Sequence, residues 1–493
     1  MKFKQFSRNL FFVPVAAGAL LCSCMTSGDE DNRNTNTIEP ESSFTYNVDG
    51  NVNFFDATLQ EDSEYDDNEF KNKITINFNG AGAPTITPVT TEGVEITANT
   101  EKGAAHLIIK SEKKINYILK GSSENGSLMI FSQRKFKLTL DNLNLSNDAG
   151  VPAVSSQTKK RCFIETVGTV NIKDAESYAL GSAYQKSETE LYDAKGAIFS
   201  EGELIFCGSG TLNVEGRYKH AICSDQYVRI SSGIVNVNGA KKDGIHTNDA
   251  VLIYGGKLNV SGITVADGAS PRKSNGIECE KGYVVIKGGE INIESPGIGI
   301  YASKEDFKKN DVMTEKSFIY IDGGKINIAT NELKGHGISS NSHLIIKGDN
   351  TVINIKALGD SAKGLKTGVN LVLNESDLEK GQIVFTGGTV NLFSSDKVLD
   401  PEDSLYIYGG TLNAIGGDCA VREKIKGSQA CAIASFSVGV KAGEKITFAG
   451  IDLGLTEADL ANGAKVVLSN KDLVAGAAPE VSIGSQTAKA EIK

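Results

Sequence analysis

The sequence predicts an all-β protein built as a right-handed parallel β-helix, with three strands per coil and about ten coils. Three observations predict this fold. An apolar-Asn-apolar tripeptide recurs along most of the chain, and a Gly-Gly pair often precedes it. Between these marks, apolar and polar residues alternate with period two, as they do in β-strands. The composition, with 53 glycines, 9 prolines and no tryptophan, fits tight turns on a regular β scaffold.

The N-terminus has the features of an export signal. Lys2, Lys4 and Arg8 precede the apolar run 10–21, which is too short to span a bilayer. Residues 1–23 are therefore predicted to be a signal peptide, and an ordinary cleaved signal without lipid is the alternative.

The signal ends in Leu21-Cys22-Ser23-Cys24, which resembles a bacterial lipobox and predicts Cys24 as the lipidated residue. Residues 24–47 are polar without apolar period, so we expect a tether there. Acidic residues soon after Cys24 resemble the surface-export signal of some outer-membrane lipoproteins. The predicted location is the outer membrane, lipid-anchored and exposed at the cell surface.

Residues 48–127 are predicted to start and cap the β-helix. An uncapped coil would leave unpaired strand edges, and this region holds further strand patterns at 74–78, 94–98, 107–110 and 115–120. Residues 419–493 are predicted to close the other end as a small β unit.

The β-helix itself is predicted over 128–418. Its repeated tripeptides are centred on asparagines spaced 22 to 42 residues apart, as expected for a coil of constant length with insertions at one corner. These asparagines are Asn144, Asn171, Asn213, Asn236, Asn259, Asn292, Asn327, Asn354, Asn391 and Asn413. The predicted insertions are 262–274, 302–316 and 373–381. The repeated asparagine is predicted to point outward and to form a ladder of amides along the axis, with a ligand contact as the alternative.

Period-two alternation assigns the inward residues of each coil. Isoleucines such as Ile222, Ile245 and Ile277 are expected to stack from coil to coil. The cysteines Cys162, Cys207 and Cys279 occupy strand positions and are predicted to be packing residues. Cys419 and Cys431 follow the last coil. They could form a disulfide or remain two free thiols, and the sequence does not decide between these alternatives.

The charge limits the class of partner. Removal of residues 1–23 changes the formal net charge from −10 to −13, which makes nucleic acid a poor candidate. An anionic polymer would also be bound poorly unless a cation or a local basic patch mediates the contact.

Several segments between about Val48 and Gln486 resemble a family of bacterial carbohydrate-binding, pectate-lyase-like β-helix proteins, of the calcium-containing polygalacturonate-binding type. The matching segments are 121–128, 195–200, 210–214, 218–222, 242–246 and 468–473. The resemblance implies a polysaccharide partner and calcium. The family often introduces its first strand with Asp-Gly-Ile; here Asp243 keeps the acid, whereas Asn275, His336 and Lys363 replace it at the equivalent positions.

The predicted metal ligands lie beside the first strand of successive coils. The turn after that strand carries an acid or amide at matching positions, and adjacent coils are about 4.8 Å apart. Carboxylates this close repel one another unless they are hydrated or bridged by a hard cation such as calcium. The candidates in this turn are Asp225, Asp249 and Glu280, with solvated turns as the alternative. The resemblance adds Asp243, at the start of the first strand, as a fourth candidate.

The predicted carbohydrate-binding residues are aromatic or basic and face outward. The outward side of the second strand is unusually apolar, which marks a contact surface. The candidates are Tyr254, Tyr283, Tyr320, Tyr406, Arg229 and, on the first strand, His246. This face either stacks on an extended sugar chain or lies under an N-terminal segment or another subunit.

Function is predicted as binding of an acidic polysaccharide, assisted by calcium and without turnover. A lyase or a glycoside hydrolase on the same scaffold is the first alternative, with His246, Asp243 and Glu278 as the residues to test for a lyase. A surface adhesin or structural protein is the second. The sequence shows no convincing catalytic base for a lyase. Pairs of carboxylates that could serve a hydrolase are too common on an acidic surface to single one out.

Overall fold

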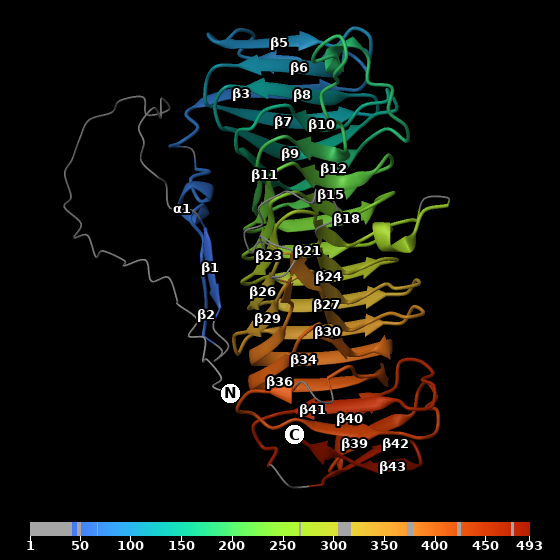
Figure 1. The fold of residues 1–493 in the computed structure, drawn as a ribbon. Coiled ribbons are helices and arrows are strands. Elements are labelled where there is room, and N and C mark those ends of the chain that lie inside the picture. The colour runs from blue at the N-terminus through green and yellow to red at the C-terminus, as the bar shows by residue number, and fades with distance from the viewer. Residues whose placement is uncertain are drawn as a thin grey trace, which may run out of the picture. The chain divides into compact units, whose positions relative to one another are not determined.

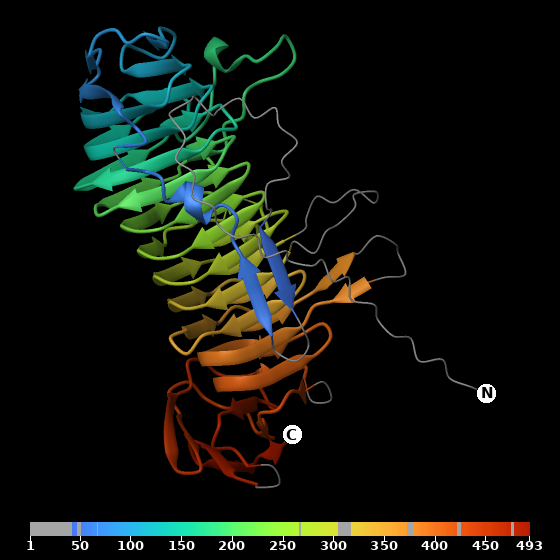
Figure 2. The ribbon, with the colours of Figure 1, turned by 90° about the vertical axis from the view of Figure 1, so that its left-hand side faces the viewer.

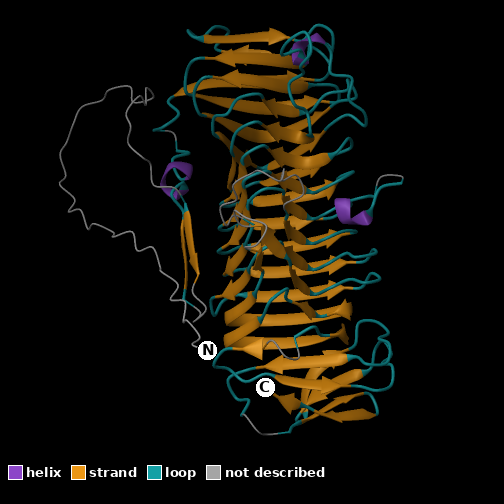
Figure 3. Ribbon diagram, in the orientation of Figure 1, coloured by secondary structure: helices purple, strands orange, loops and turns teal. Residues whose placement is uncertain are grey.

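A computed structural model describes residues 42–46, 51–66, 68–265, 268–303, 317–371, 378–421, 425–474 and 478–493. Over these residues the chain is nearly all β, with long sheets of parallel strands (Figures 1 and 3). Its described helices are short, namely α1 (Leu59–Asp62) and the 3-10 turns η1 (Ser182–Tyr184) and η2 (Pro271–Lys273). Within the described ranges, no helix is long and apolar enough to cross a membrane. Cys24 and the rest of the predicted signal and tether up to residue 41 lie outside the described residues.

One sheet collects the first strands of the repeats, and we call it the first-strand sheet. Its neighbours are parallel except for the first pair, β5 with β6. The strands are β5 (Val94–Ala98), β6 (His106–Ser111), β8 (Ser127–Ser132), β10 (Val154–Ser156), β13 (Gly196–Ser200), β16 (His220–Ser224), β19 (Ile245–Thr247), β22 (Ile277–Cys279), β25 (Ile300–Ala302), β28 (Ile338–Ser340), β31 (Leu365–Thr367) and β35 (Leu399–Asp400).

Second and third strands also pair with their counterparts one repeat on. The second strands are β11 (Cys162–Val167), β14 (Leu204–Gly208), β17 (Tyr227–Ile230), β20 (Ala250–Ile253), β23 (Tyr283–Ile286), β26 (Ile319–Asp322) and β29 (Leu344–Lys347). The third strands are β12 (Thr169–Lys173), β15 (Thr211–Glu215), β18 (Ile234–Gly239), β21 (Lys257–Val260), β24 (Glu290–Ser295), β27 (Lys325–Thr330) and β30 (Val352–Ala357). In some repeats the second and third strands form one continuous strand, as in β9 (Phe136–Ser146), β34 (Ile383–Lys397) and β36 (Leu405–Asp418).

The first repeats and the C-terminal region differ from this pattern. At the start, β3 (Asn72–Asn79) pairs with β4 (Thr85–Thr87) antiparallel and with β7 (Ile115–Ser123) in parallel. The short hairpin β32 (Val369–Leu371) and β33 (Leu378–Lys380) is inserted in a late repeat. The C-terminal strands are β37 (Ile425–Lys426), β38 (Ala432–Ser435), β39 (Lys445–Phe448), β40 (Ile451–Leu455), β41 (Lys465–Ser469), β42 (Glu480–Ile483), β43 (Gln486–Lys489) and β44 (Glu491–Ile492).

Parallel pairing in register confirms the predicted stacking of like residues. Ile222 lies opposite Ile245, and Ile245 lies opposite Ile277, and all three are fully buried. The handedness and the number of coils stay predictions, as do the domain boundaries.

The predicted asparagine ladder is confirmed. Nine hydrogen bonds join the ten asparagines, each amide nitrogen donating to the amide oxygen one repeat earlier, with N–O distances of 2.5–2.9 Å. The ladder continues through repeats with long insertions, such as the step from Asn213 back to Asn171. Insertions therefore leave the register of the third strands unchanged.

The described cysteines are free thiols, and all of them are buried. Cys162 and Cys279 belong to the main core, as predicted for packing residues, and Cys207 is also buried. Cys419 and Cys431 are free as well, so the structure decides the open question against a disulfide.

Residues 42–46, 51–66 and 68–70, which we call the strap, lie along the outer side of the second strands (Figure 2). The strap contains the hairpin β1 (Ser43–Tyr46) and β2 (Val52–Phe55), followed by α1. Phe44 stacks on Phe318 with ring centroids 4.0 Å apart, and Phe54 meets Tyr283 edge to face at 5.8 Å. The strap therefore covers much of the aromatic face that the sequence shows on the second strands.

Candidate functional site

A hollow opens at the N-terminal end of the first-strand sheet. It has a volume of about 620 Å³ and is lined by residues of β5, β6, β8 and the turns beside them. Most of the lining is polar, with Phe131 as its aromatic member; the lining residues are Gly93, Val94, Glu95, Lys110, Ser111, Glu112, Phe131, Ser132, Gln133, Gln157 and Thr158. A concave site with convergent polar groups and an aromatic ring is the usual form of a small-ligand or sugar site.

Two lining residues are held in place from outside the hollow. The ring of Phe131 is half-buried and meets Tyr192 edge to face, with centroids 5.0 Å apart. Gln157 donates from Nε2 to Ser155 Oγ at 2.6 Å and to the Asp193 carbonyl at 2.7 Å. Gln157 Oε1 has no hydrogen-bond partner among the described residues, although the side chain is largely buried. This part of the hollow is thus preorganised.

An acidic cluster adjoins the hollow through Gln157. Asp193, Glu201 and Asp225 place carboxylate oxygens within 4.8 Å of one another. Lys195 Nζ lies among them, 2.6 Å from Asp193 and 3.0 Å from Asp225. Burial, followed by the neighbouring carboxylates Asp225 and Asp193, raises the pKa of Glu201. The pKa of Asp225 is also raised, chiefly by burial, against the lowering effect of Lys195.

The acidic cluster fits the chemistry of calcium. Three carboxylates supply the hard oxygen ligands that calcium prefers, and their mutual repulsion is only partly offset by Lys195. Of the four predicted metal ligands, only Asp225 belongs to this cluster. Asp249 is exposed in the turn after β19, outside both groups of metal-capable side chains found among the described residues.

A second cluster is buried and contains two histidines. Asp243 Oδ2 lies 3.2 Å from His220 Nδ1 and 3.2 Å from His246 Nδ1, and the two imidazole rings stack with centroids 4.3 Å apart. His246 lies opposite Glu278 in the sheet, with 4.0 Å between Nδ1 and Oε2. Glu280 is 3.5 Å from His246 Nε2. The nitrogen atoms around Asp243 suit calcium poorly, and its role as a calcium ligand stays a prediction.

Protonation in the histidine cluster departs from ordinary values. Burial, followed by His246, lowers the pKa of His220 to about 3. Burial alone would lower the pKa of His246, but Asp243 and Glu280 raise it to about 9. Burial, followed by Asp243, raises the pKa of Glu278 to about 8. A protonated carboxyl beside a charged imidazole could transfer protons, but His246 is only 6% exposed and Glu278 only 3%.

The Asp-Gly-Ile position has a structural role. Asp243 Oδ1 accepts the backbone N–H of Asn275 at 2.9 Å, and Asn275 Oδ1 accepts that of Ile298 at 2.8 Å. His336 Nδ1 accepts the backbone N–H of Lys363 in the same way at 3.1 Å. Asp, Asn and His interchange here because each offers a short side-chain acceptor to the next repeat. We call this set of bonds the acceptor ladder.

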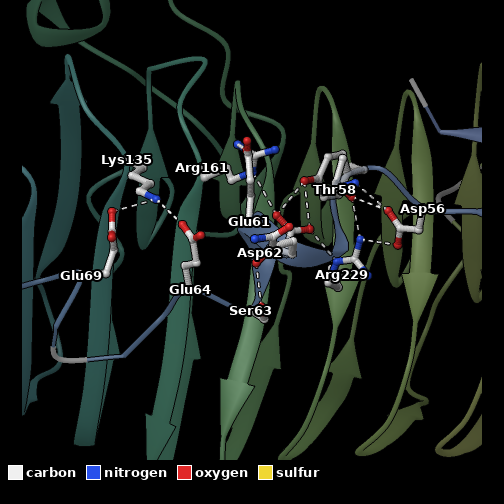
Figure 4. A network of polar contacts seen from close by, with 12 residues as sticks. Asp56, Thr58, Glu61, Asp62, Ser63, Glu64, Glu69, Lys135, Arg161 and Arg229 are labelled. Atoms are coloured by element: carbon white, nitrogen blue, oxygen red, sulfur yellow. Dashed lines mark hydrogen bonds and ion pairs between the residues drawn. The ribbon is translucent and has the colours of Figure 1, made fainter. Parts of the chain in front are cut away.

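The predicted carbohydrate-binding residues of the second strands are covered. Arg229 is fully buried, with Nε 2.5 Å from Asp62 and Nη2 2.7 Å from Asp56 (Figure 4). Tyr320 is 1% exposed and Tyr406 is 8% exposed.

The two remaining tyrosines of this set belong to the same covered cluster. Tyr254 donates its hydroxyl to Asp56 at 2.7 Å, and Tyr283 packs on Phe54. Four of these residues contact the strap and form its seat rather than an open sugar platform, namely Arg229, Tyr254, Tyr283 and Tyr320. Tyr406 is buried beside Tyr408 and Lys426 instead. The alternative of cover by an N-terminal segment is the one that the structure bears out.

Sequence reasoning missed the hollow and part of the acidic cluster. Asp193 lies in an irregular insertion ahead of β13, where no repeat signals it. Phe131 and Gln157 are joined only by the parallel pairing of β8 with β10. The acids that recur after the first strand, Glu201 and Asp225, were the one signal that pointed here.

Comparisons with known proteins identify the family. The family model of carbohydrate-binding domain-containing proteins matches residues 102–330 and 306–473. No curated protein matches the chain. Among solved structures, the chain is similar to a polysaccharide lyase-like protein from C. thermocellum, studied as a gadolinium derivative, with 17% identity over 60% of this chain and 94% of that chain and a TM-score of 0.39. The family matches span most of the sequence, and the chain therefore belongs to the family of carbohydrate-binding domain-containing proteins.

Proposed function

We propose that this chain binds polysaccharide in the hollow beside Phe131 and Gln157, without cleaving it. The observation that carries the proposal is the hollow itself, where a fixed aromatic ring is surrounded by polar side chains. Sugars offer apolar C–H faces to such a ring and hydroxyls to the polar groups around it. Membership of a carbohydrate-binding family supports the same partner.

The bound glycan is proposed to be acidic, with calcium as mediator. Asp193, Glu201 and Asp225 adjoin the hollow and would hold the cation. Calcium bound there would supply a positive charge for a uronate carboxylate, which the acidic surface of the chain would otherwise repel. Lys195 already contributes one positive charge at this position.

The protein is proposed to work as a lipoprotein at the outer surface of the cell. This proposal rests on the Leu21-Cys22-Ser23-Cys24 segment and the acidic residues behind it. The lipid would attach the chain to the outer membrane through Cys24.

Cleavage is the second candidate function. It is favoured by one observation, the contact of His246 with Asp243 beside a carboxyl of raised pKa at Glu278. The burial of all three side chains weighs against it, since a polysaccharide must reach the reacting groups. An adhesin that uses the aromatic second-strand face is disfavoured because the strap covers that face.

Binding can be tested by affinity electrophoresis and calorimetry with polygalacturonate and a neutral β-glucan. We expect Phe131→Ala and Gln157→Ala each to weaken binding at least tenfold, which is about 1.4 kcal/mol. Phe55→Ala is the matched control, because Phe55 is 53% exposed on the strap and does not line the hollow. Unchanged affinity in both hollow variants would place the binding site elsewhere.

A further inference from the structure

We propose that His220, Asp243 and His246 bind a divalent transition-metal cation of the zinc class. The inference is independent of the polysaccharide site proposed above. It rests on the spacing of three ligand atoms, on their chemical type and on what the acceptor ladder leaves unexplained.

The spacing of the ligand atoms fits one small cation. Asp243 Oδ2 is 3.2 Å from each histidine Nδ1, and each of the three residues offers a ligand atom within 4.8 Å of the other two. In a tetrahedral zinc site, bonds of about 2.0–2.1 Å place neighbouring ligand atoms about 3.3 Å apart. The spacing of the atoms therefore fits shared coordination, for which the two imidazole rings, now stacked 23° from parallel, would turn their nitrogens toward one cation.

The ligand types select the class of metal. Two imidazole nitrogens and one carboxylate oxygen suit zinc and neighbouring transition metals better than calcium or magnesium. The far nitrogen of His246, Nε2, lies 3.5 Å from Glu280 Oε2. A carboxylate that accepts the second N–H of a ligating histidine is the usual support for a metal-bound imidazole.

The acceptor ladder does not account for this convergence. Asp243 takes part in it through Oδ1, whereas Oδ2 faces the two histidines. The ladder bond into His220 Nδ1 is 3.4 Å long, compared with 2.8–3.1 Å at the other positions described above. His220 Nδ1 thus lies closer to the carboxylate than to its ladder donor.

Glu278 supplies the fourth ligand in this proposal. Its Oε2 lies 4.0 Å from His246 Nδ1 and accepts a hydrogen bond from Asn275 Nδ2 at 3.0 Å. Its other oxygen accepts from Ser303 at 3.2 Å. A small side-chain shift would bring Oε2 to the cation, and the metal charge would offset the two buried carboxylates.

The experiment measures metal directly. The purified chain is stripped with chelator under denaturing conditions and refolded with zinc or cobalt(II), because the site is buried. We expect one tightly held metal per chain and, with cobalt, the intense visible absorption of a tetrahedral complex. Zinc should also raise the melting temperature of the wild type, since it binds the folded state.

Three variants and one control make the test specific. His220→Asn and Asp243→Asn each keep an acceptor for the ladder, as Asn275 shows, and His246→Gln lies outside the ladder. Each should fold without metal and lower zinc affinity at least a hundredfold. His336→Asn changes the equivalent ladder histidine outside the cluster and should bind zinc like the wild type. Zinc binding that is absent in the wild type, or unchanged in Asp243→Asn and His246→Gln, would overturn the proposal.

Discussion

Arg229 Nε donates to Asp62 Oδ2 at 2.5 Å, and both side chains are fully buried although 167 residues separate them. Asp62 also accepts from Arg161 Nε at 3.0 Å and from the hydroxyl of Tyr227 at 3.0 Å (Figure 4). One carboxylate at the end of α1 therefore joins the strap to the second strand β17 and to Arg161, the residue directly before β11. The strap is held by a buried polar network as well as by the ring contacts of Phe44, Phe54 and Phe70.

We expect Asp62→Ala to destabilise the chain by about 3–5 kcal/mol, because it removes one partner of a buried ion pair and leaves Arg229 short of an acceptor. Urea unfolding measures the change. The control is Asp459→Ala, which breaks the exposed Lys441–Asp459 pair and should leave the free energy of unfolding nearly unchanged. Equal losses in the two variants would show that the strap network adds no stability.

The strap should also weaken in acid through Glu69. Burial alone would raise the pKa of Glu69, but Lys135 and Lys114 lower it below its ordinary value of 4.5. A lowered pKa gives stability that is present above pH 4.5 and is lost as the pH falls through the folded value. Glu69→Gln should therefore show a smaller loss of stability between pH 6 and pH 3 than the wild type, measured by thermal unfolding. An identical pH dependence in the two proteins would contradict this assignment.

The asparagine ladder should contribute most at its interior positions. Asn259→Ala removes two ladder bonds, to Asn236 and from Asn292, and should cost about 1–3 kcal/mol. Asn144 begins the ladder and takes part in one bond. Asn144→Ala is therefore expected to cost about half as much in the same unfolding assay. A purely ligand-binding role would instead leave stability unchanged in both variants.

Repetition made the fold predictable. Residues that recur once per repeat, such as Asn259 and Ile277, carry their own register, because each contacts its counterpart in the next repeat. The acceptor ladder also recurs once per repeat, but it is recognised only when the structure is known. Asp243, Asn275 and His336 look dissimilar as letters, but each offers the same kind of acceptor atom.

Non-repeating contacts were the part that sequence reasoning could not place. For the apolar face around Tyr320, sequence reasoning left sugar stacking and cover as alternatives, because its cover, Phe44, lies far away in sequence and has no periodic signal. Asp193 is brought to Asp225 by an insertion whose path follows no pattern. Of the candidate site, sequence reasoning thus named Asp225 and missed Asp193, which belongs to no repeat.

Lipidation is predicted at Cys24, which lies outside the described residues. Cys24→Ala should abolish labelling with a fatty-acid analogue and leave uncleaved precursor, because lipobox processing requires the thiol. Cys22→Ala is the matched control and should be labelled and cleaved normally. Normal labelling of the Cys24 variant would show that Cys24 is not the lipidated cysteine.

The last prediction concerns calcium in polysaccharide binding. If Asp193, Glu201 and Asp225 hold a cation that contacts a uronate, a chelator should weaken binding to polygalacturonate. Moderate sodium chloride should weaken it less, since salt screens exposed charges over roughly 8 Å but does not remove a coordinated ion. Asp225→Asn and Glu201→Gln should each reduce the calcium-dependent part of the affinity.

Asp249→Asn is the control for those variants, because Asp249 is an exposed acid on the same side of the repeats but outside the acidic cluster. It should bind as the wild type does, with and without chelator. Binding to polygalacturonate that is unchanged by chelator would contradict the proposed role of calcium but not the proposal that the chain binds polysaccharide. Long incubation could instead yield unsaturated uronate products or new reducing ends. If these products are absent with His246→Gln, cleavage and not binding alone would be the function, because product formation requires a catalytic site.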